Sequence, residues 1–159
     1  MVLADCCPNA ATAKADGRNG RNTGTGLGVA RHFTADRQAP YEALEWERRA
    51  AVIANDKGEV LFERKDIEVP ADWSQTATNI VASKYFHGRL GSPERESSVA
   101  QLVHRVVDTI AAWGERDNYF ASREAAEIFR DELAHLVLTQ KASFNSPVWF
   151  NVGVHFRPK

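Results

Sequence analysis

The sequence predicts a mainly α-helical domain that carries one β-hairpin. Two long segments, 92–114 and 122–141, repeat apolar residues every three to four positions, as the buried face of a helix requires. Between residues 51 and 63, two short apolar runs flank the turn sequence Asn-Asp-Lys-Gly, which is typical of a hairpin. The 159 residues suffice for one domain of ordinary size.

The composition is that of a soluble globular protein. Hydrophobic residues make up 43% of the chain, charged residues 26%, and the formal net charge is −1. A nearly neutral chain gives no electrostatic reason to expect nucleic-acid or membrane binding. No apolar run approaches the roughly 20 residues of a membrane helix, and the apolar start 1–4 is too short for a signal-peptide core. The expected compartment is the cytoplasm.

Residues 1–28 are predicted to be a disordered tail rich in Gly, Ala and Asn, and residues 29–159 the folded domain. The glycines at 24, 26 and 28 are interpreted as a hinge, because no strand precedes them as a phosphate loop requires. Cys6 and Cys7 are the only cysteines, which excludes a disulfide framework within one chain. They are either ordinary thiols or a pair that shuttles reducing equivalents.

The first folded elements are short. Tyr41–Arg48 is predicted to form a helix, and the hairpin strands are expected at 51–54 and 59–63. Asp72 is the predicted N-cap of the next helix, which ends near Gly88. Its polar residues could contact a ligand or face water, and we expect them to face water; they are Gln75, Thr78 and Asn79.

The two long helices are predicted from their caps and apolar stripes. Ser92 and Pro93 suit the start of the first, and Gly114 its end. Ser122 suits the N-cap of the second. The predicted core stripe of the first helix comprises Val99, Leu102, Val103, Val106, Val107, Ile110 and Trp113.

The run ASFNSPVWFNVG at 142–153 is the most informative stretch. Because proline restricts the residue before it, Ser146 is expected to be extended, with its hydroxyl free to meet a ligand. Val148–Val152 is predicted to be a buried strand. The run is either a turn that holds an anion or sugar, or a plain loop before an edge strand. Such a strand lacks an obvious partner, which predicts an incomplete fold.

The residues alone define no catalytic centre. There is no Ser/His/Asp arrangement, no cluster of metal ligands, and no cysteine after Cys7. Asp131 and Glu132 are adjacent, so on a helix they point in different directions and do not form a catalytic carboxylate pair.

FNSPVWFNVG resembles the segment before the first active-site strand of adenosylcobalamin-dependent (class II) ribonucleotide reductases. Further similar segments lie upstream in the same order, so that the resemblance spans roughly residues 29–158. These segments are ARHFT, EWERRAAVIANDKGEVLFE, VPADWSQTATNIVASKYFHG, PERESSVAQLVHRVVDTIAAWG and FRDELAHLVLTQ.

The resemblance implies the N-terminal helical part of the reductase fold, ending at the first barrel strand. In this family, adenosylcobalamin generates a thiyl radical that starts the reduction of ribonucleotides, and the Ser or Thr before proline contacts the substrate phosphate. Ser146 matches that position, and Asn145 and Val148 flank it as further substrate-binding residues. The catalytic cysteines and the cofactor surface are expected outside this chain, which is predicted to hold no metal site.

The partners that the resemblance implies are a ribonucleoside diphosphate and the remainder of the reductase polypeptide or a complementary chain. The chain alone is predicted to be inactive. Two alternatives are a stand-alone helical interaction module and a degenerate gene product without a role.

Overall fold

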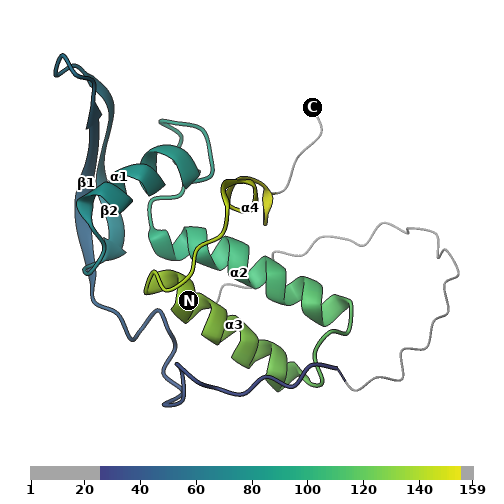
Figure 1. Cartoon of the computed structure of the whole chain (residues 1–159). Coiled ribbons are helices and arrows are strands. Elements are labelled where there is room, and N and C mark those ends of the chain that lie inside the picture. The colour runs from purple at the N-terminus through teal and green to yellow at the C-terminus, as the bar shows by residue number, and fades with distance from the viewer. Residues whose placement is uncertain (1–25, 155–159) are drawn as a thin grey trace, which may run out of the picture.

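The computed structural model describes residues 26–154, so most of the predicted tail, including both cysteines, lies outside the described residues. A β-hairpin at one side is followed by a helical part, in which two long helices lie side by side and two short helical regions adjoin them (Figure 1). The elements are β1 (Trp46–Ala54), β2 (Val60–Pro70), α1 (Gln75–Ile80), the π-helical segment η1 (Val81–Tyr85), α2 (Val99–Arg116), α3 (Arg123–Leu138) and α4 (Ser146–Asn151).

The hairpin prediction is confirmed, but the hairpin is longer than predicted. β1 and β2 pair antiparallel from Trp46 opposite Pro70 to Ala54 opposite Val60. The helix predicted at Tyr41–Arg48 is wrong, because the charged residues at 47–49 pair with the end of β2. Arg49 fixes this register by donating to the carbonyl of Ala71 at 2.7 Å and to that of Trp73.

Polar residues of α1 attach this helix to the hairpin. Gln75 donates to the carbonyl of Ala50 at 2.8 Å, and Asn79 donates to that of Val52 at 3.0 Å. Thr78 is fully buried, so the prediction that it faces water is wrong. The helix begins after Ser74, whose side chain accepts the N–H of Ala77, and not after Asp72.

The core stripe of α2 is confirmed for its first residues. Five of them are buried, namely Val99, Leu102, Val103, Val106 and Val107, whereas Trp113 is 43% exposed. The predicted start at Ser92 is wrong: Ser98 caps the helix, and Gln101 completes a capping box. The predicted stop at Gly114 is also wrong, since the helix continues to Arg116. A Cβ at residue 114 would lie 2.4 Å from the Phe120 ring, so this glycine serves close packing.

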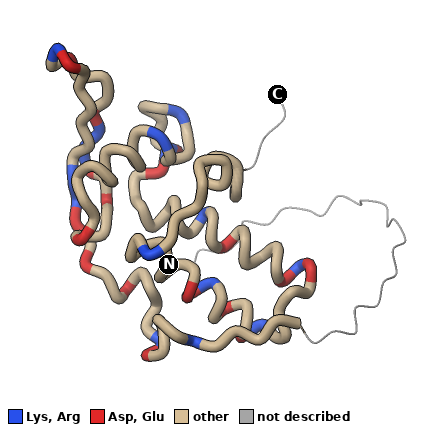
Figure 2. The backbone as a smooth tube through the Cα atoms, viewed as in Figure 1, with Lys and Arg blue, Asp and Glu red and all other residues tan. Residues whose placement is uncertain are grey.

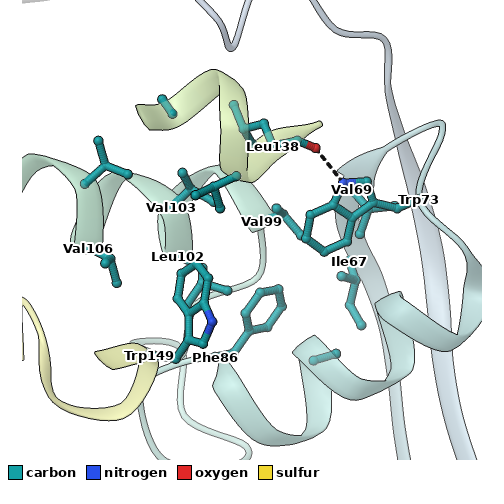
Figure 3. Packing of buried hydrophobic residues seen from close by; sticks show 14 of the residues in the cluster. Ile67, Val69, Trp73, Phe86, Val99, Leu102, Val103, Val106, Leu138 and Trp149 are labelled. Carbon is teal, nitrogen blue, oxygen red and sulfur yellow. Dashed lines mark hydrogen bonds between the residues drawn. The ribbon is translucent and has the colours of Figure 1, made fainter. Parts of the chain in front are cut away.

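Helix α3 begins as predicted, after Ser122, whose side chain accepts the N–H of Ala125 at 3.1 Å. Buried residues of α3 pack with those of α2 and of the hairpin in a single hydrophobic core. Figure 3 shows Trp149 beside Leu102 and Phe86, and the Trp73 indole pointing to the Leu138 carbonyl. That indole N–H donates to this oxygen at 2.7 Å.

Charged residues of both signs are interspersed along the helices and the hairpin (Figure 2). Within residues 26–154, no helix is both long and apolar enough to cross a membrane.

Candidate functional site

The segment that contains Ser146 is a helix and not a strand. Helix α4 covers Ser146–Asn151, so the predicted strand Val148–Val152 is wrong. Asn145 is the extended residue before it, and its side chain accepts the N–H of Val148. Pro147 lies in the first turn, where a missing N–H costs no helical hydrogen bond. The extended residue is thus Asn145, one position earlier than predicted.

The three predicted substrate-binding residues lie together at the start of α4, and each already has a local contact. The Ser146 Oγ is 3.0 Å from the hydroxyl oxygen of Tyr85. The Val148 N–H donates to the Asn145 carbonyl at 3.1 Å and to its side-chain oxygen at 3.4 Å. The main-chain donor of Val148 and the side-chain acceptor of Asn145 therefore serve the helix cap. Ser146 keeps a hydroxyl whose partner is another hydroxyl.

A largely buried ion pair holds the far end of α4. Arg105 of α2 donates from Nε to Glu96 Oε1 at 2.7 Å, and the two side chains are 10% and 12% exposed. The same guanidinium donates to the carbonyls of Val152 at 2.7 Å and Trp149 at 3.2 Å. Because the last carbonyls of a helix lack helical partners, these bonds cap α4.

Gly153 allows the chain after α4 to pass close to the backbone of α2. Its φ is +72°, and a Cβ there would lie 2.5 Å from the Arg105 carbonyl oxygen. Any side chain would therefore both strain the backbone and push α4 off α2. The glycine, Arg105 and Glu96 together fix where Ser146 lies.

Two cavities adjoin α4. One, of about 370 Å³, is bordered mainly by apolar residues of α1, η1, α2 and α4, including Ile80, Val81 and Trp149. The other, of about 450 Å³, lies between α4 and the loop after η1, and carries Lys84, Arg89 and Glu94 on its wall. Tyr85 borders both. Among residues 26–154, no three His, Cys, Asp or Glu side chains come together as a metal site would require.

Comparison with known proteins identifies the family. Residues 47–140 match the sequence model of the class II vitamin B12-dependent ribonucleotide reductases. The chain belongs to this family. It is 49% identical over 142 residues to the vitamin B12-dependent ribonucleotide reductase of Streptomyces coelicolor, covering 89% of this chain and 15% of that protein. The Rhodopirellula baltica reductase is 51% identical over 121 residues, covering 76% and 12%.

A more distant reductase, from Agrobacterium fabrum, is 32% identical over 162 residues, which cover 80% of this chain and 13% of that protein. The chain thus spans about 15% or less of the length of these reductases. The predicted family is confirmed, and the resemblance extends well beyond the Ser-Pro turn.

Neither of the two cavities beside α4 is large enough to enclose vitamin B12. The cavities beside α4, of about 370 and 450 Å³, have the size that suits a drug-like ligand and are too small to enclose a corrinoid ring with its nucleotide tail. The wall of the smaller cavity is largely apolar and offers a corrin few polar partners.

Sequence reasoning missed Tyr85, Glu96 and Arg105. Tyr85 and Arg105 lie more than 40 residues before the α4 residues that they contact, and Glu96 acts through Arg105, so no local spacing predicts these contacts. The available signal was the resemblance itself, because the similar segments include ASKYFHG and PERESSVAQLVHR.

Proposed function

We propose that this chain is the N-terminal portion of an adenosylcobalamin-dependent ribonucleoside-diphosphate reductase, which acts in the cytoplasm and reduces ribonucleotides to 2′-deoxyribonucleotides by radical chemistry. The observation that carries the proposal is the 49% identity to a vitamin B12-dependent ribonucleotide reductase across 89% of the chain. The portion contributes Ser146, with Asn145 and Val148 beside it, to the site of the substrate phosphate. A serine hydroxyl suits an anion because it donates a hydrogen bond without a titrating charge.

The remainder of the reductase supplies the cofactor site and the catalytic cysteines. The only cysteines of this chain are Cys6 and Cys7, at least 120 residues before the α4 region. The chain alone is therefore expected to reduce no ribonucleotide.

A chimeric reductase tests the proposal. The segment of the Streptomyces coelicolor reductase that matches this chain is replaced by residues 29–154, and ribonucleoside-diphosphate reduction is measured with added adenosylcobalamin. We expect activity, because the two segments are 49% identical over 142 residues. A folded chimera that binds cofactor but reduces no ribonucleotide would contradict the proposal.

In that chimera, Ser146→Ala is expected to raise KM for the substrate about tenfold, because one hydrogen bond to a charged group is lost. The matched control is Asn151→Ala, which removes an exposed α4 side chain whose amide donates to the Pro147 carbonyl at 2.8 Å. The control should keep the normal KM. An unchanged KM in Ser146→Ala would remove this serine from the site.

The face formed by Ala77, Ile80, Val81, Tyr85, Trp149 and Phe150, which we call the α1–α4 face, supports a role as part of a larger protein. Ile80 is 43% exposed and Phe150 48% exposed, and the apolar cavity opens between α1 and α4. We propose that the remainder of the reductase covers this face.

The isolated chain is consequently expected to bind a hydrophobic dye such as anilinonaphthalene sulfonate. The double variant Ile80→Ser, Phe150→Ser should lose most of that fluorescence, whereas Leu61→Ser, on the exposed part of the hairpin, should not. A dye-silent monomer would instead favour a self-contained interaction module.

A further inference from the structure

The residue that contacts Ser146 comes from an unusual helical turn. In η1 the N–H of Phe86 donates to the carbonyl of Val81 at 3.1 Å, five residues back, as in a π-helix. Such turns are rare and recur at functional sites. Here the wide turn keeps Ala82 and Phe86 in the core, while the ring of Tyr85 packs on α4.

The Tyr85 side chain is fixed by aromatic contacts. Its ring centroid lies 5.3 Å from that of Phe150 and 6.4 Å from that of Trp149. The ring borders the apolar cavity on one side and the cavity with Lys84 and Arg89 on the other. Two cations against the single carboxylate of Glu94 give the second cavity a surplus of positive charge, which favours an anion.

The two hydroxyls form a donor pair with one donor to spare. Over the 3.0 Å between the Tyr85 and Ser146 oxygens, one O–H donates and the other oxygen accepts. The accepting hydroxyl still has its own proton, which it can donate to a third group. The pair therefore offers an anion one hydrogen bond. This bond is stronger than that of an isolated hydroxyl, because the hydrogen bond within the pair polarises the donating O–H group.

We propose that Tyr85 and Ser146 bind the diphosphate group of the substrate as one hydroxyl pair, in which one hydroxyl donates to the anion and the other orients it. The inference rests on the proposed role of Ser146. It adds the residue that orients the serine, and it places the anion at the junction of η1 and α4, where Tyr85 also borders the cavity that carries Lys84.

A purely structural role predicts something different. If the hydroxyl contact only fastened α4 to η1, Tyr85→Phe would lower the stability of the chain and would not change anion binding in the part that stays folded. The test therefore measures thermal unfolding and ligand binding on the same samples.

The experiment titrates the ¹⁵N-labelled chain with ADP, with pyrophosphate as the probe without a nucleoside and adenosine as the probe without phosphate. Amide shifts of residues 84–88 and 146–150 report binding. The variants are Tyr85→Phe, Ser146→Ala and the control Asn151→Ala. We expect ADP and pyrophosphate, but not adenosine, to shift these amides. Both hydroxyl variants should weaken binding about tenfold with little change in Tm, and the control should bind normally.

The other outcomes overturn specific claims. Normal binding by Tyr85→Phe with weakened binding by Ser146→Ala overturns the role of Tyr85 and leaves the proposed function intact. Weakened binding by Tyr85→Phe alone overturns the role of Ser146 and the pair with it. Tyr85→Phe that loses stability but binds normally establishes the structural role. Shifts with adenosine alone, or with no probe, overturn anion binding at this junction altogether.

Discussion

Arg105→Ala is expected to destabilise the chain by about 3 kcal/mol, the lower end of the range for removing one partner of a buried ion pair, because this pair is partly exposed. The substitution leaves the Glu96 carboxylate, 12% exposed, without its countercharge. It also removes the donor that the carbonyls of Trp149 and Val152 share at the end of α4. We therefore expect α4 to loosen before the rest of the helical core.

Urea unfolding followed by tryptophan fluorescence gives the free energy, and hydrogen exchange of the amides at 148–152 gives the local effect. The matched control is Arg123→Ala, which breaks the exposed pair with Glu127 on α3, 3.2 Å apart, and should change little. Equal losses in both variants, or intact protection of α4 in Arg105→Ala, would contradict this role for Arg105.

Caps and apolar stripes predicted the long helices because both signals are local. Ser122 was recognisable as a cap, and the stripe from Val99 to Val107 identified the buried face of α2. The predicted start at Ser92 was wrong because more than one serine in this region could cap the helix. Only Ser98 has a glutamine, Gln101, three residues later to complete a capping box. Arg95 holds the intervening loop by donating to the carbonyls of Gly88 and Ala82.

The failure at α4 has a different cause. Val148, Trp149 and Val152 are residue types that favour strands, yet their spacing also places them on one side of a short helix. A five-residue stretch with four apolar residues does not distinguish the two structures. A local cap and a tertiary contact decide it: Asn145 caps the start of the helix, and Arg105, 47 positions away from Val152, caps its end. The candidate site was likewise beyond local reasoning, since Tyr85 meets Ser146 across 61 positions.

The second large effect concerns Glu132, which fastens the segment before the hairpin to α3. Its carboxylate accepts the N–H groups of His32, Phe33 and Thr34 at 2.9–3.0 Å and the Thr34 hydroxyl at 2.7 Å. Partial burial acts to raise the pKa of Glu132, but these hydrogen bonds outweigh it and lower the pKa from 4.5 to about 2. The neighbouring pair of Arg31 and Asp131, 2.9 Å apart, holds the same segment.

Glu132→Gln is therefore expected to cost about 2 kcal/mol at pH 7, because an amide accepts fewer and weaker bonds than a carboxylate. Since the folded pKa is below the unfolded one, the carboxylate stabilises the fold above pH 4.5, and this contribution is lost as the pH falls toward 2. Urea unfolding at pH 7, 5, 4 and 3 gives the free energy of unfolding of the parent chain and of Glu132→Gln. The difference between these two free energies should shrink as the pH falls below 4.5. The control Glu127→Gln, with its exposed partner Arg123, should show only a small difference throughout. A gap for Glu132→Gln that stays constant from pH 7 to 3 would mean that its ionisation does not hold this segment.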